Sequence, residues 1–138
     1  GDTRAQALAR LDAALTALVQ AAEFKLTGRT SWQLGQLMVN GIPFVIDEQT
    51  RFKDGLDEDD LGGTWVDLEG VIEGDRRLVR EVEPLEEKHE MELEGPVAQG
   101  RIWGYVTSDD SLTPFEGRWL ELECRFDGMR LSRCREDD

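Results

Sequence analysis

The sequence predicts a mainly β protein, in which an N-terminal amphipathic helix precedes two tandem small β modules. Apolar residues recur at helical spacing only near the N-terminus, whereas short apolar runs and turn signals fill the rest of the chain. Two segments of the β part also align with each other, which indicates a repeated unit. We expect the helix within residues 1–28, the first module at 29–90 and a shortened second module at 91–138.

The expected helix extends from residue 3 to residue 25 and ends near Gly28, a residue that commonly terminates helices. Its alanines favour helix, and its apolar stripe is narrow, like a coiled-coil seam. The helix would either pack on its own β body or pair with another subunit. The stripe consists of Leu8, Leu11, Leu15, Leu18, Val19 and Ala22.

Two hairpins are predicted in the first module. Asn40-Gly41 separates the apolar runs 37–39 and 42–46, and this dipeptide is a strong hairpin signal. The second hairpin is expected around residues 73–75, and an acidic loop at 47–63 connects the two.

The repeat is most visible at residues 63–74, which align without gaps on 117–128. Upstream, 35–37 resembles 95–97 more weakly. Alternation places Trp65 and Trp119 at equivalent positions on an otherwise acidic face. We expect both to pack against a second layer, because tryptophan carries a large apolar area.

The alternative for these tryptophans is a recognition surface. Trp103 and Tyr105 could add aromatic platforms to it, as in barrels that stack nucleic-acid bases.

The motif order resembles the bacterial domain-of-unknown-function family 5666. After a hairpin come Asp-Glu-Gln-Thr-Arg-Phe at 47–52, Leu-Gly-Gly at 61–63, Trp-Val-Asp-Leu-Glu-Gly at 65–70 and Leu-Val at 78–79. The resemblance covers residues 35–84 well and 92–135 loosely. Trp65, Trp119 and Cys124 depart from the small residues typical of the family. The resemblance implies OB-like or small β-barrel modules, often in tandem, in envelope-associated proteins, and it implies no activity.

The net charge of −14 is the strongest compositional feature. Nucleic-acid binders displace counterions with Lys and Arg, so we expect no direct nucleic-acid binding and no attraction to anionic membranes. Metal ions, polyamines or a basic protein would suit this charge. No stretch approaches the roughly 20 apolar residues of a membrane span.

The two cysteines, Cys124 and Cys134, lie on the last predicted hairpin and are either a disulfide of an exported protein or two free thiols. A two-residue turn at Asp127-Gly128 would place Cys124 opposite Leu131. A disulfide would therefore need a bulge or a longer loop.

The acidic loop contains the best candidate cation site, because calcium takes six to eight oxygen ligands from a loop that wraps it. The spacing is not that of an EF-hand, and the alternative is a solvated loop. The candidate ligands are Asp54, Asp57, Glu58, Asp59 and Asp60.

No catalytic motif or cofactor motif is present, and His89 is the single histidine. We therefore expect a non-catalytic binding or assembly module of the bacterial cell envelope, periplasmic or extracellular, with the cytoplasm as the alternative. Its partner would be another protein or a second copy that pairs through the N-terminal helix. The alternative functions are an acidic cation-binding protein, and an OB-like nucleic-acid-related protein or DNA mimic that binds a basic protein.

Overall fold

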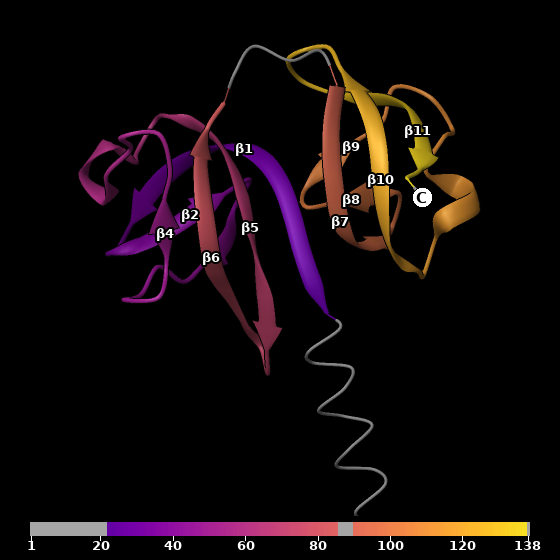
Figure 1. Cartoon of the computed structure of the whole chain (residues 1–138). Coiled ribbons are helices and arrows are strands. Elements are labelled where there is room, and N and C mark those ends of the chain that lie inside the picture. Colours follow the sequence, from indigo (N-terminus) through magenta and orange to yellow (C-terminus); the bar gives the residue numbers. More distant parts are fainter. Residues whose placement is uncertain (1–21, 86–89, 138) are drawn as a thin grey trace, which may run out of the picture.

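The computed structural model describes residues 22–85 and 90–137, and this part of the chain is mainly β, as predicted (Figure 1). Most of the expected N-terminal helix, at residues 1–21, lies outside the described residues. Its predicted end is wrong, because residues 23–25 belong to a strand, and Gly28 lies inside that strand. Phe24 and Leu26 are buried while Lys25 between them is not, which is the two-residue period of a half-buried strand.

Each half of the described chain contains a comparable set of strands. The first half consists of β1 (Glu23–Gln33), β2 (Gln36–Val39), β3 (Ile42–Phe44), β4 (Arg51–Phe52), the 3-10 helix η1 (Glu58–Asp60), β5 (Trp65–Glu73) and β6 (Arg76–Pro84). The second half consists of β7 (Glu90–Ala98), β8 (Arg101–Ile102), β9 (Tyr105–Val106), the 3-10 helix η2 (Thr113–Phe115), β10 (Trp119–Phe126) and β11 (Leu131–Glu136).

The main sheet has the strand order β11-β10-β7-β1-β5-β6-β4, so β1 lies between the two halves (Figure 1). Strands β1 and β7 share the single register pair Lys25–Glu94 and otherwise diverge. Additional bridges join Val45 to Leu78 in the first half and Thr107 to Leu131 in the second. In each half these bridges connect the end of the short inner hairpin to the last long strand.

The strand pairings of the first half recur in the second. β1 pairs with β2 and β5, and β7 pairs in the same way with β8 and β10. Gly28 faces Val66 and Gly95 faces Leu120, so Gly95 corresponds to Gly28. The weak match of residues 35–37 with 95–97 is therefore wrong, and the correspondence begins at β1, ahead of residue 29.

Both predicted hairpins of the first half are confirmed. Val39 pairs with Ile42 across the Asn40-Gly41 turn, and Glu73 pairs with Arg76.

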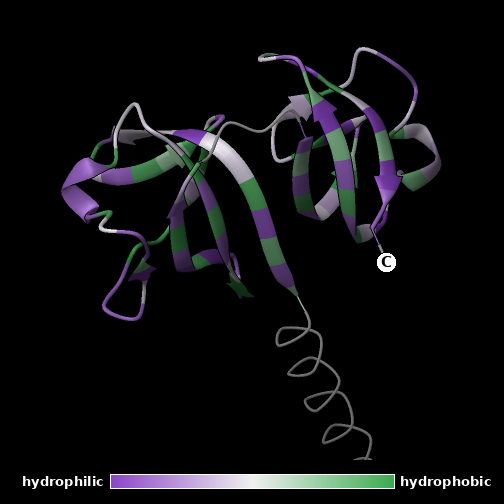
Figure 2. Ribbon diagram, turned by 45° about the horizontal axis from the view of Figure 1, so that its top comes forward, coloured by the Kyte–Doolittle hydropathy of each residue, from purple (hydrophilic) through white to green (hydrophobic). Residues whose placement is uncertain are grey.

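The two halves share one apolar core, and Figure 2 shows hydrophilic and hydrophobic residues alternating along the strands. The ring of Trp103 from the second half lies 5.7 Å from that of Phe24 and 5.8 Å from that of Phe44. The burial of these large rings is the main stabilising contribution at the junction.

Three side chains also donate hydrogen bonds to backbone carbonyls of the opposite half. Tyr105 Oη donates to the carbonyl of Thr27 at 2.7 Å, and Trp119 Nε1 donates to that of Glu23 at 3.0 Å. In the other direction, Asn40 Nδ2 donates to the carbonyl of Trp103 at 2.9 Å. Side-chain donors of each half therefore satisfy backbone carbonyls of the other, and the Tyr105 bond is buried.

Candidate functional site

One face of the main sheet carries an acidic row that crosses six strands. The register places Glu94 opposite Glu121, Lys25 opposite both Glu94 and Glu69, and Glu69 opposite Glu81. Because side chains alternate between the faces of a sheet, these residues project from the same side. The row runs from β10 to β4 in the order Glu121, Glu94, Lys25, Glu69, Glu81 and Arg51.

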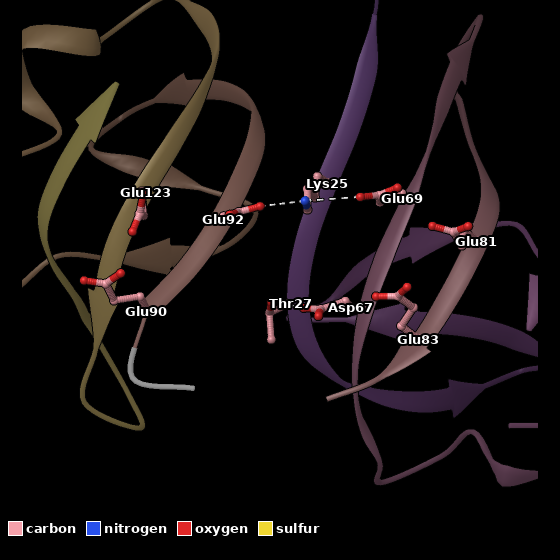
Figure 3. Close-up of a pocket in the computed structure, with 9 residues that line it drawn as sticks. All are labelled: Lys25, Thr27, Asp67, Glu69, Glu81, Glu83, Glu90, Glu92 and Glu123. Atoms are coloured by element: carbon pink, nitrogen blue, oxygen red, sulfur yellow. Dashed lines mark hydrogen bonds and ion pairs between the residues drawn. The ribbon is translucent and has the colours of Figure 1, made fainter. Parts of the chain in front are cut away.

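A hollow of about 400 Å³ lies beside this row. Figure 3 shows acidic side chains approaching it from both halves of the molecule, with Lys25 between them. Lys25 is the one basic residue among the described residues that line it. We call this surface the acidic hollow, and its lining is Lys25, Thr27, Asp67, Glu69, Glu81, Glu83, Glu90, Glu92 and Glu123.

Lys25 joins the two halves across the acidic hollow. Its Nζ lies 2.6 Å from a carboxylate oxygen of Glu92 and 3.2 Å from one of Glu69 (Figure 3). Partial burial alone would lower the pKa of Lys25, but the hydrogen bonds to both carboxylates outweigh it and raise the pKa above its usual value. The hollow therefore already stabilises one ammonium group.

Two carboxyl groups in the same region have raised pKa values. Desolvation, followed by the charges of Glu121 and Glu23, raises the pKa of Glu94. A side-chain hydrogen bond with Glu90, followed by desolvation, raises the pKa of Glu123. Both shifts mean that added positive charge would be favourable here.

Replacing Glu94 with glutamine is expected to stabilise the protein at pH 7 by ~0.5 kcal/mol after solvent screening. When the pKa of a carboxyl is higher in the folded than in the unfolded state, the free energy of unfolding of the protein falls as the pH rises through the folded-state pKa. The gain should therefore disappear below about pH 4, where the carboxyl is neutral in both states. Urea titrations at pH 7 and pH 4 measure it, and Glu73→Gln at the exposed end of β5 is the control. An equal gain at both pH values would contradict this account.

The structure places the predicted tryptophans on the acidic face, as the alternation indicated. Trp65 and Trp119 are 36% and 42% exposed, and each is partly packed. The ring of Trp65 lies 5.8 Å from that of Phe126 in the opposite half, and Trp119 stands edge-to-face with Trp103 at 6.2 Å. Both tryptophans therefore have a packing role while keeping an accessible edge.

The aromatic platforms predicted at Trp103 and Tyr105 are wrong, because both side chains are buried. Trp103 Nε1 donates to the carbonyl of Glu94 at 2.8 Å, and the hydroxyl of Tyr105 is bonded to Thr27. Their rings fill the core between the halves and cannot stack on an external base.

Cys124 and Cys134 form a disulfide with a Cα–Cα distance of 4.1 Å. The disulfide was expected to need a bulge or a longer loop, and both are present. The turn is longer than two residues, since Phe126 pairs with Leu131, and a register shift follows between Glu123 and Arg125. The Asp127 carboxylate stabilises this turn by accepting hydrogen bonds from the backbone N–H groups of residues 129 and 130.

The acidic loop does not assemble the predicted cation site. Its five candidate ligands are exposed, and Asp60 Oδ2 accepts the backbone N–H of Asp57 at 2.8 Å, closing the loop on itself. Within the described ranges, the acidic groups close enough to share a metal ion lie elsewhere. They are Glu92, Glu121 and Asp137, whose carboxylate oxygens lie within 4.8 Å of one another.

Sequence reasoning missed the acidic hollow as a site. Its residues come from β1, β5, β6, β7 and β10, and their proximity depends on long-range pairing. The available signal was the alternation of acidic and apolar residues, as in Glu90, Glu92 and Glu94.

No protein-family model, curated protein or solved structure matches this chain. The resemblance to family 5666 stays a prediction. None of the helices in the described ranges has the length and apolar character needed to cross a bilayer.

Proposed function

We propose that this protein is a non-catalytic binding module that holds a basic protein segment in the acidic hollow. The observation that carries the proposal is the acidic hollow itself, in which Lys25 already lies between the carboxylates of Glu69 and Glu92. A partner's lysine or arginine side chains would find the same carboxylate environment on either side of Lys25. Complementary charge of this kind favours fast association and partner specificity.

The architecture supports a rigid scaffold for such binding. We propose that the two halves are tandem copies of one small OB-like barrel, because the same pairings recur and an extra bridge links the inner hairpin to the last strand in each. The disulfide favours an oxidising compartment, so we propose a periplasmic or extracellular envelope protein that is related to the bacterial family 5666. We further propose that the N-terminal segment pairs with a second copy through its apolar stripe.

A decalysine peptide tests the binding proposal. Isothermal titration calorimetry should detect binding that weakens as salt is added, because exposed charges are screened. The triple variant Glu83→Gln, Glu90→Gln and Glu123→Gln removes three charges that line the hollow on three strands. We expect it to weaken binding at least tenfold.

The matched control removes three charges from the acidic loop through Asp57→Asn, Glu58→Gln and Asp59→Asn. Because both triples change the net charge equally, the control should alter the Kd less than twofold. Equal losses in the two variants would show that binding follows net charge alone, and would overturn the assignment to the hollow.

A divalent cation is the second candidate ligand, favoured by the proximity of Glu92, Glu121 and Asp137. Calcium at millimolar concentration should then raise Tm by mass action, and Glu121→Gln should abolish the rise. An unchanged Tm in the wild-type protein would remove this candidate.

A further inference from the structure

The first turn of each half has the same backbone shape. Leu34 and Gly35 connect β1 to β2 with φ values of 52° and 75°, and Gln99 and Gly100 connect β7 to β8 with 55° and 70°. Two consecutive residues with positive φ define the type I′ hairpin turn. The two turns therefore present equivalent pairs of backbone N–H groups.

In the second half, a carboxylate from the same chain accepts hydrogen bonds from both of these N–H groups. The two oxygens of Glu116 accept the N–H groups of Gln99 and Gly100, the latter at 3.1 Å. Successive backbone N–H groups commonly form such anion-binding concavities. The second half thus shows which ligand the turn accepts.

Within residues 22–85, no carboxylate occupies the equivalent position. Gly63 donates to the carbonyl of Thr30 just as Gly117 donates to that of Val97, so Gly62 stands where Glu116 does. Among the described residues, no side chain accepts a hydrogen bond from the N–H groups of Leu34 or Gly35.

The hairpin of the first half is also longer. Beyond Thr30–Val39, the pairs Trp32–Leu37 and Gln33–Gln36 have no counterpart in β7 and β8. At about 3.4 Å per residue, these two pairs carry the turn about 7 Å farther out. The Leu34–Gly35 turn therefore lies farther from its own half than the Gln99–Gly100 turn does, and out of reach of the loop that corresponds to the one carrying Glu116.

Two exposed apolar side chains lie in or beside the Leu34–Gly35 turn. Leu34 is fully exposed at a position where positive φ favours Gly, Asn or Asp, whereas the matching Gln99 is polar. Trp32 is 40% exposed, and its Nε1 is fixed by a 3.1 Å hydrogen bond to the carbonyl of Leu61. Gln33 and Gln36 beside the turn are uncharged, so no formal charge adjoins the N–H pair within the hairpin.

We propose that the Leu34–Gly35 turn is a second docking site, which binds an Asp or Glu carboxylate of a partner protein that has an apolar side chain beside it. The carboxylate would accept both N–H groups, as Glu116 does in the second half. The apolar neighbour would contact Leu34 and the exposed part of Trp32. This site is independent of the acidic hollow, since it lies at the far end of β1 from Lys25 and binds the opposite charge.

The test titrates the 15N-labelled protein with 3-methylbutanoate, which joins a carboxylate to a leucine-like group, and with the corresponding amide. Added 3-methylbutanoate should shift the backbone N–H signals of Leu34 and Gly35, with saturation in the millimolar range. The control compound, 3-methylbutanamide, should not shift them. The signals of Gln99 and Gly100 should stay in place, because Glu116 occupies them.

Glu116→Ala supplies the matched control within the same molecule. It frees the second turn, so Gln99 and Gly100 should now respond to 3-methylbutanoate as Leu34 and Gly35 do. Leu34→Asn keeps the favoured turn geometry and should weaken binding at least threefold while raising Tm. Unmoved Leu34 and Gly35 signals in the wild-type protein, or an equal response to the amide, would overturn the proposal.

Discussion

Replacing Gly70 with alanine is expected to destabilise the protein by at least ~3 kcal/mol. A Cβ at this position would lie 2.0 Å from the carbonyl oxygen of Leu78 and 2.6 Å from the ring of Phe24. The first contact is with backbone of the neighbouring strand, at the register shift between β5 and β6, and backbone cannot move without disturbing the pairing. Phe24 is held in the shared core, so it cannot yield either.

Gly100→Ala is the matched control for this measurement. A Cβ there meets nothing within 4 Å, and its cost comes only from the positive φ of 70°, which amounts to about 1 kcal/mol. Urea unfolding of the two variants compares them directly. If Gly70→Ala were no more destabilising than Gly100→Ala, the close approach of β5 and β6 would be wrong.

Removing the disulfide through Cys124→Ala and Cys134→Ala is expected to cost about 2.5 kcal/mol, because the bridge closes a short loop and restricts the unfolded chain. Both cysteines are also buried, so the variant loses core contacts at the end of the sheet. The expected fall in Tm is roughly 8 °C.

A reducing agent provides the control for that variant. Reduction of the wild-type protein should lower Tm by a similar amount, and the same agent should leave the double variant unchanged. A variant that melts at the wild-type temperature would contradict a stabilising role for the bridge.

The half-buried strands were predictable because their alternation is local. In β5 and β10, buried Val66 and Leu120 follow exposed Trp65 and Trp119, and the same period continues along each strand. The start of β1 was missed because the helical spacing that ends at Ala22 leads directly into Phe24 and Leu26. The two periods overlap there, and pairing with β5 decides in favour of the strand.

The acidic hollow could not be predicted from the sequence because the chain has 30 acidic residues and none is distinctive. Its geometry depends on β1 pairing with both β5 and β7, which brings Lys25 to residues that are distant in the chain. For a similar reason, the sequence left undecided whether the two cysteines form a disulfide or stay free thiols. A bulge changes which residues face each other, and local composition does not specify a bulge.

The position of β1 has a consequence for how the molecule unfolds. The strand belongs to the first half, yet its backbone carbonyls at Glu23 and Thr27 accept hydrogen bonds from side chains of the second. Opening either half would leave those donors without partners and would expose the rings between the halves. The two halves should therefore melt together in one cooperative transition, so the described chain behaves thermodynamically as a single body.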